Sequence, residues 1–251
     1  MKKKLISLMI DTGSYRSFID RILNLASTGK SSYICVANVH MMIEAYQDAK
    51  FADVVNHADM VTADGVPLTW GLKLIHHIKQ DRVAGMDLLP DLLSEMEKQN
   101  MGAYFYGGTQ LMLDKTEEYV HDLYPDLNIS GLYSPPFRAL SAAEDQEIFD
   151  NINASGAKVI FVALGCPKQE KWMAKAKGHV NGCMIGIGGA LPVMIGLQKR
   201  APIAMQRIGM EWFYRLMQEP KRLFMRYFVT NTTFIWLLFK ARLNRASHQE
   251  N

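Results

Sequence analysis

One aspartate stands out as a group that could carry out chemistry. Asp64 follows a short apolar run, residues 60–63, and precedes Gly65. A carboxylate at a strand end, followed by glycine, can project into a cleft, where it would act as a general base on an attacking hydroxyl. The same spacing also suits a plain cap for a helix that begins near Pro67. Spacing alone leaves both interpretations open.

Glycine and polar residues follow several other apolar runs in the same way. Because glycine lets a backbone approach a phosphate, and a helix N-terminus offers unpaired N–H groups, such turns are typical of nucleotide diphosphate sites. Packing explains any single turn equally well, and a capping role explains Glu170; only the number of turns favours a ligand. The candidate residues are Asn38, Gly107, Gly108, Gly165, Lys168, Gln169, Glu170 and Gly188.

These turns can converge if the runs before them are strands of one parallel sheet. Short apolar runs alternate with amphipathic stretches, which is typical of β-α units, and ligands then bind outside the carboxyl ends of the strands. We therefore predict an α/β fold, a mostly parallel, Rossmann-like sheet with helices on both faces. The predicted strands are 5–10, 33–39, 60–63, 103–106, 127–133, 158–164 and 183–187, and the predicted helices are 14–26, 41–57, 87–99, 111–124, 142–152 and 168–177.

Motifs that would indicate other chemistry are absent from the sequence. It has no Asp-x-Asp pair, the usual cue for a metal-bound sugar nucleotide, no P-loop, and no G-x-G-x-x-G at the first strand. Its histidines and cysteines have no metal-ligand spacing. We expect metal-free group transfer without a cofactor, and a nucleotide-dependent oxidoreductase is the weaker alternative.

The charge of the chain is divided unevenly. Residues 198–251 carry ten Lys and Arg against three Glu, a net +7, so residues 1–197 carry −4 of the total of +3. The regular alternation ends near Gly196, and the charged, proline-containing segment 199–202 suits an exposed hinge. We therefore predict a catalytic domain, 1–197, and a basic helical appendage, 198–251, whose partner is anionic.

The appendage is predicted to contain two helical pieces, 205–218 and about 221–245. Residues 227–239 carry no charge, but thirteen residues are fewer than the ~20 that a membrane-spanning helix needs. With cations on both sides, the segment is typical of a helix that lies on an anionic membrane surface, here the cytoplasmic face. The alternatives are that it packs on the body or on a second copy of the chain, or that the protein is a non-catalytic membrane adaptor. We expect no nucleic-acid partner.

With these motifs in view, the sequence resembles one family over nearly its whole length. It is similar to the WecG/TagA/CpsF glycosyltransferases, glycosyltransferase family 26. The resemblance is carried by four ordered blocks, residues 58–65 (ADMVTADG), 165–172 (GCPKQEKW), 199–202 (KRAP), and 211–215 (EWFYR) with 219–222 (EPKR).

The resemblance implies an inverting, metal-independent transfer of a sugar from a UDP-sugar to a sugar on a polyprenyl diphosphate, in the assembly of a bacterial surface polysaccharide. It makes Asp64 the general base and the turn of Gln169 part of the donor site. It also implies that Arg215, Arg222 and Arg226 meet the acceptor diphosphate, a task that suits the planar fork of arginine.

Two residues depart from the family pattern, and one run points to a branch within the family. Val36 stands where many members have threonine, so a polar contact from that side chain is missing. Met225 stands where many members have the first of two arginines, so only Arg226 carries over. The run 38–41, Asn-Val-His-Met, resembles an exopolysaccharide branch of the xanthan type, in which the donor is UDP-glucose rather than UDP-N-acetylmannosamine.

Overall fold

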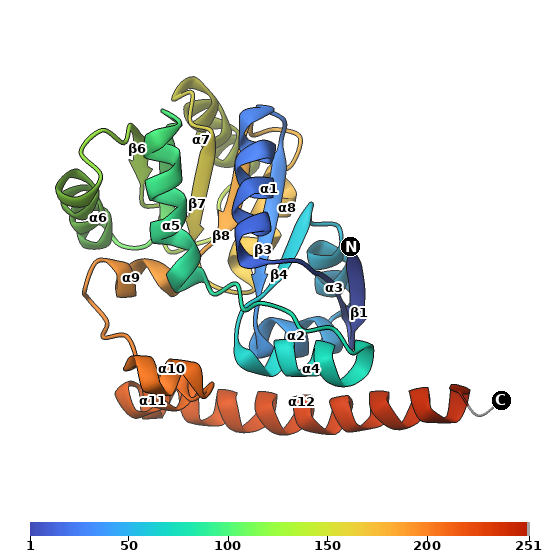
Figure 1. Ribbon diagram of the computed structural model, residues 1–251. Coiled ribbons are helices and arrows are strands. Elements are labelled where there is room, and N and C mark those ends of the chain that lie inside the picture. Colours follow the sequence, from blue (N-terminus) through green and yellow to red (C-terminus); the bar gives the residue numbers. More distant parts are fainter. Residues whose placement is uncertain (250–251) are drawn as a thin grey trace.

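The computed structural model describes the backbone of residues 1–249 and the side chains of residues 1–243. Its centre is a six-stranded parallel sheet with the strand order β4-β3-β8-β7-β5-β6, which confirms the predicted α/β fold (Figure 1). The strands are almost wholly apolar because helices cover both faces of the sheet. They are β3 (Ser32–Ala37), β4 (Met60–Ala63), β5 (Ala103–Gly107), β6 (Ile129–Tyr133), β7 (Val159–Ala163) and β8 (Cys183–Gly186).

Two hydrophobic clusters, one on each face, hold the helices against the sheet. Successive strand residues point to opposite faces, so Ile34 and Val36 belong to one cluster and Cys35 and Ala37 to the other. The cluster of Ile34 receives α1 (Tyr15–Ser27), α5 (Gly85–Lys98), α6 (Gln110–Leu123) and α9 (Ala190–Met194). The cluster of Cys35 receives α2 (Val39–Gln47), α3 (Ala49–Asn56), α4 (Val66–His76), α7 (Ala142–Ala154) and α8 (Lys168–Ala176).

The N-terminal segment is the clearest error in the predicted strands. Residues 5–10 do not form a strand of the main sheet; β1 (Lys2–Leu5) and β2 (Leu8–Asp11) pair with each other as an antiparallel hairpin. Ile6 turns the chain with a positive φ of 54°. The hairpin is fixed to the body at Asp11, whose buried carboxylate accepts a hydrogen bond from the backbone N–H of Val61 at 3.0 Å.

Helical spacing also hid a break in the helix predicted over 41–57. It is two helices, α2 and α3, because Asp48 leaves the helical conformation and its side chain caps the N-terminus of α3 at Lys50 and Phe51. Apolar periodicity continues through such a cap and therefore does not reveal it.

The C-terminal segment forms α10 (Ile203–Arg207), α11 (Glu211–Gln218) and the long α12 (Pro220–Gln249). We call residues 198–249 the appendage. One face of α12 packs against α2 and α4 and buries Leu223, Phe234 and Leu237, so packing on the body holds for that face (Figure 1). No helix within the described residues is long and apolar enough to cross a membrane.

The segment 199–202, which its composition predicted to be an exposed hinge, is exposed at Lys199 and Pro202 but anchored between them. Ala201 is buried, and the guanidinium of Arg200 pairs with Asp87 at the start of α5. The charge of Arg200 is therefore paired with a carboxylate of the body. Composition alone cannot distinguish such an anchored connection from a solvated one.

Candidate active site

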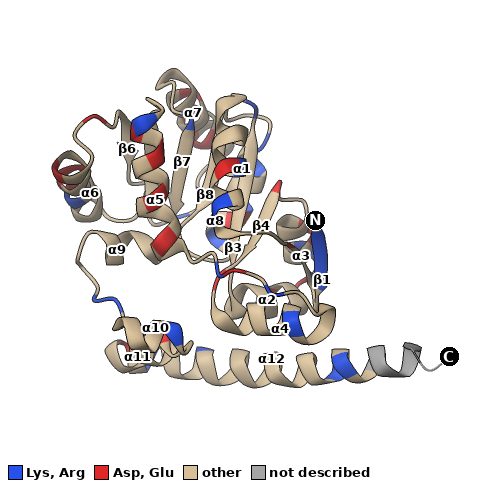
Figure 2. Cartoon of the chain, viewed as in Figure 1, with Lys and Arg blue, Asp and Glu red and all other residues tan. Residues whose placement is uncertain are grey.

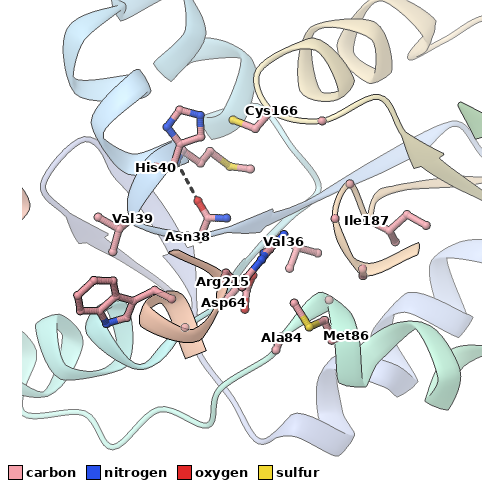
Figure 3. Close-up of a pocket in the computed structure, with 18 of the residues that line it drawn as sticks. Val36, Asn38, Val39, His40, Asp64, Ala84, Met86, Cys166, Ile187 and Arg215 are labelled. Atoms are coloured by element: carbon pink, nitrogen blue, oxygen red, sulfur yellow. Dashed lines mark hydrogen bonds between the residues drawn. The ribbon is translucent and has the colours of Figure 1, made fainter. Parts of the chain in front are cut away.

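The carboxyl ends of the strands and the appendage enclose one cleft of about 580 Å³. Strand-end turns from β3, β4, β7 and β8 line one side, and α11 and α12 line the other. Most of the predicted site residues meet here, as Figure 3 shows for several of them. The cleft includes Asn38, Asp64, Gly165, Lys168, Gln169, Gly188, Arg215, Arg222 and Arg226, whereas Gly107, Gly108 and Glu170 do not line it.

Asp64 extends into this cleft from the end of β4. Its backbone N–H donates to the carbonyl of Ala37 at 2.7 Å, which ties the turn to the neighbouring strand. The helix-cap interpretation is wrong, because the N-cap residue of α4 is Gly65 and no side chain within the described residues makes that cap. Asp64 is half-buried, and it lines the cleft together with Arg215 (Figure 3).

The protein surroundings hold Asp64 in the range of a near-neutral base. Burial raises the pKa of Asp64 to about 7, and the negative charge of Glu211 acts in the same direction. Arg82 and Arg215 lower that pKa, and Asp87 raises it slightly. A carboxylate with a pKa near the working pH is well matched to taking a proton from a hydroxyl.

Asn38 caps α2, and this role fixes the orientation of its side chain. Its Oδ1 accepts a hydrogen bond from the backbone N–H of Met41 at 3.1 Å (Figure 3). Because that contact requires an acceptor, Oδ1 is committed to the helix, and the amide nitrogen is the group that can donate to a ligand.

The side chain of Gln169 is oriented by two hydrogen bonds. Its Oε1 accepts from the backbone N–H of Gly165 at 3.1 Å, and its Nε2 donates to Glu170 at 2.7 Å. A side chain at Gly186 would place its Cβ 2.7 Å from that Nε2, so glycine is needed there. Glu170 is fully buried, and burial raises its pKa. The structure therefore places Glu170 behind Gln169, outside the cleft.

Gly107 and Gly108 have packing reasons to be glycine. Gly107 has a φ of +108°, and a Cβ there would lie 2.8 Å from the backbone carbon of Ala163 on the neighbouring strand. Gly108 has a φ of +79°, a left-handed conformation that favours glycine, and a Cβ there would lie 3.2 Å from the flexible end of Met112, which lines the cleft. These two glycines set the path of the chain at the edge of the site.

We expect Gly107→Ala to lower the free energy of unfolding by ~2–4 kcal/mol, because left-handed backbone strain and a backbone clash add together. Urea unfolding would measure the change. Gly156→Ala is the matched control: its φ is +70° with nothing within 4 Å of the added Cβ, so ~1 kcal/mol is expected. Equal losses in the two variants would contradict the packing role of Gly107.

The appendage supplies three arginines in different settings. Arg215 lies against Gly189, where an added Cβ would meet its guanidinium at 2.7 Å. Arg222 pairs with Glu219, and Arg226 lies near His40, whose pKa is lowered by burial and then by that positive charge. The appendage side of the cleft therefore carries three arginines and one carboxylate, that of Glu211.

The departures from the family pattern occupy different places in the structure. Val36 lines the cleft, so the apolar side chain replaces a hydroxyl within the site. Met225 is 64% exposed and does not line the cleft. Its substitution for arginine therefore changes the outer surface of α12 in this structure.

Sequence reasoning missed Arg82, and it did not assign Glu211 or Trp212 a role. All three line the cleft, and Arg82 donates to Glu211 across 2.9 Å. Glu211 and Trp212 lie in the Glu-Trp-Phe-Tyr-Arg block, a signal from which only Arg215 was assigned. Arg82 lies in the loop between α4 and α5 and does not follow a strand in the sequence, so it gave no local signal.

The described side chains offer no cluster of metal ligands. Within the part of the chain that the structure describes, no group of three or more His, Cys, Asp or Glu side chains could hold a metal ion. The positively charged side chains that line the cleft are Lys168, Arg82, Arg215, Arg222 and Arg226.

Comparison with known proteins decides the family. The WecG/TagA/CpsF glycosyl transferase family matches residues 3–248. The chain belongs to this family. An N-acetylglucosaminyldiphosphoundecaprenol N-acetyl-beta-D-mannosaminyltransferase of Bacillus spizizenii is 34% identical over 195 residues, which cover 77% of this chain and 74% of that relative. The protein is therefore a glycosyltransferase, and the oxidoreductase and adaptor alternatives are set aside.

Proposed function

We propose that this glycosyltransferase moves a sugar from a UDP-sugar to a sugar on a polyprenyl diphosphate, with inversion and without a metal. The observation that carries the proposal is that one cleft contains both Asp64, whose pKa is about 7, and a wall lined by arginines. A base and a field of positive charge are what a transfer from a diphosphate leaving group requires.

In the proposed reaction, the ionised Asp64 takes the proton of an acceptor hydroxyl. The hydroxyl oxygen attacks the anomeric carbon and forms the new glycosidic bond. The bond between that carbon and the phosphate oxygen breaks, and UDP leaves with the electron pair. A single displacement of this kind inverts the anomeric carbon. Positive charge in the cleft stabilises the negative charge that develops on the leaving diphosphate.

The two sides of the cleft suit the two substrates. We assign the donor to the body side, where the amides of Asn38 and Gln169 are fixed and Gly165 and Gly188 leave backbone accessible. We assign the acceptor diphosphate to Arg222 and Arg226, with Arg215 next to the reacting centre beside Asp64. Two-point pairing between guanidinium and phosphate gives the acceptor a fixed orientation.

For the donor, we propose UDP-N-acetylmannosamine. The support is the relative from Bacillus spizizenii, whose name gives an N-acetylmannosaminyl group transferred to N-acetylglucosaminyldiphosphoundecaprenol. The run at Asn38 favours UDP-glucose and an exopolysaccharide product instead. A panel of UDP-sugars, each supplied with a polyprenyl-diphosphate-N-acetylglucosamine acceptor, tests the proposal. Faster transfer from UDP-glucose than from UDP-N-acetylmannosamine would overturn it.

We also propose that α12 rests on the cytoplasmic face of the membrane. Four exposed apolar side chains of α12 follow one another at spacings of four, seven and four residues, which places them on one face of the helix, away from the face of the buried Leu223. They are Phe224, Phe228, Ile235 and Phe239. The ribbon of α12 is mostly uncharged along its length, with Lys and Arg at intervals (Figure 2). An exposed apolar strip with flanking cations suits an anionic lipid surface. The exposed apolar residues of α12 are Phe224, Met225, Phe228, Val229, Ile235, Trp236, Phe239 and Leu243.

We expect the double variant Trp236→Ser with Phe239→Ser to bind anionic vesicles at least ~10-fold more weakly, since each buried aromatic contributes ~1.5–3 kcal/mol. Sedimentation with vesicles of phosphatidylglycerol measures the change. Phe137→Ser is the matched control, because Phe137 is an 89% exposed aromatic in a loop of the body. An intact protein that does not sediment with these vesicles would contradict membrane docking.

A further inference from the structure

Four side chains of alternating charge form a closed ring where the appendage meets the body. Arg82 donates to Asp87 and to Glu211, both across 2.9 Å. Arg200 pairs with the same two carboxylates, with its Nε 3.6 Å from Glu211. Each charge in this ring contacts two of the opposite sign. Arg82 and Asp87 belong to the body, whereas Arg200 and Glu211 belong to the appendage.

Two features of its surroundings strengthen the ring: nearby helix N-termini and low exposure to water. Asp87 and Glu211 lie in the first turns of α5 and α11, where the positive end of a helix dipole favours a carboxylate. The side chains of Arg82 and Glu211 are only 20% and 16% exposed, so water screens their attraction less than it screens a surface pair. The ring fastens the appendage at the edge of the cleft.

Two members of the ring, Arg82 and Glu211, line the same cleft as Asp64. The charged groups that act on the Asp64 carboxylate are Glu211 and Arg215 from α11, Arg82 from the loop before α5, and Asp87 from α5. Of these groups, Glu211 has the largest effect on the pKa of Asp64, and Arg82 acts on that pKa in the opposite direction. Of the four, Glu211 and Arg215 arrive with the appendage.

We propose that Glu211 is a positioning residue for Asp64: it holds Arg82 in the ring and keeps a negative charge facing the base when the appendage is seated. The effect of Glu211 on catalysis rests on the proposed function, whereas its effect on Arg82 and on the charge of Asp64 does not. Without Glu211, Arg82 has lost one of its two carboxylates and turns toward Asp64. An Asp64 paired with Arg82 is a more acidic group and a weaker base.

The experiment is a titration of Asp64 in the full-length Glu211→Gln variant. The ¹³C signal of the Asp64 carboxyl, assigned by its loss in Asp64→Asn, reports its protonation without substrate. We expect its pKa to fall from about 7 in the parent by ~1 unit or more in Glu211→Gln. The acid limb of kcat/KM should move to lower pH by the same amount. Glu211→Asp, which keeps the charge, should restore at least half of the shift.

Glu144→Gln is the matched control, because it breaks the pair between Glu144, on α7, and Arg138, in the loop before α7, and both residues lie outside the cleft. It should leave the Asp64 titration unchanged. If Glu211→Gln does not fold, Asp87→Asn releases Arg82 from the body side and should shift the same signal downward. An unchanged Asp64 titration in a folded Glu211→Gln or Asp87→Asn overturns the inference. A shifted titration in a protein that transfers no sugar refutes the proposed function alone.

Discussion

Asp64→Asn is expected to lower kcat by ~10²–10⁴-fold, the usual contribution of a general base. The amide is nearly the same size as the carboxylate, so binding of both substrates should persist, but it cannot accept the proton of the attacking hydroxyl. Release of UDP in the presence of both substrates measures turnover. Because Asp64 makes no cap for α4, the loss cannot be assigned to a broken helix start.

Asp59→Asn is the matched control for this experiment. Asp59 precedes β4 as Asp64 follows it, and its carboxylate accepts from the backbone N–H of Tyr33 at 2.9 Å, a contact that asparagine can keep. Its turnover should remain close to that of the parent. Turnover of Asp64→Asn within a few-fold of the parent would remove Asp64 as the base.

The pH profile of the parent follows from the same carboxylate. Only the ionised form of Asp64 can take a proton, so kcat/KM should fall as the pH drops below about 7 and level off above it. The direction is that of a base whose pKa burial has raised. In Asp64→Asn this acid limb should disappear from the residual rate.

The second large effect is expected from the appendage. Replacing both Arg222 and Arg226 by alanine should lower kcat/KM for the acceptor by ~10²–10⁴-fold, since a hydrogen bond to a charged group contributes ~1.5–3 kcal/mol and each 1.4 kcal/mol is tenfold. The KM for the donor should change little, because the donor is assigned to the body side. Steady-state kinetics with a soluble short-chain acceptor separates the two.

The control and the decisive comparison use the same assay. Arg242→Ala removes an exposed arginine from the same helix, outside the cleft, and should leave the soluble reaction unchanged. An acceptor with a monophosphate in place of the diphosphate should be the poorer substrate for the parent, and the double variant should distinguish the two acceptors much less. If the double variant keeps the full preference for the diphosphate, these arginines do not bind it.

The sheet and most of the site were predictable because both depend on local signals. Apolar runs such as 158–164 and 183–187 mark strands of a parallel sheet, and parallel strands bring their carboxyl ends to one edge. That argument alone placed Asp64, Gln169 and Gly188 together. Family resemblance was needed for the arginines of the appendage, since no period or turn links them to the sheet.

What the sequence did not reveal depends on contacts between distant residues. The pair of Arg82 with Glu211 joins positions 129 apart, and neither residue lies in a strand-end turn. Glycine is needed at Gly107 because of the backbone of a neighbouring strand. The sequence does not show that neighbour, and the residue therefore looked like a phosphate-binding glycine. Glu170 sits beside a site residue in sequence, yet the helix turns its side chain into the core.

The central claim is tested most directly by the mass of the lipid acceptor. The full-length protein, mixed with UDP-N-acetylmannosamine and a polyprenyl-diphosphate-N-acetylglucosamine acceptor in the presence of a metal chelator, should produce an acceptor heavier by one N-acetylhexosamine residue, with one UDP released for each sugar transferred. An acceptor of unchanged mass with each UDP-sugar of the panel, or transfer that stops when the chelator is added, would contradict the account.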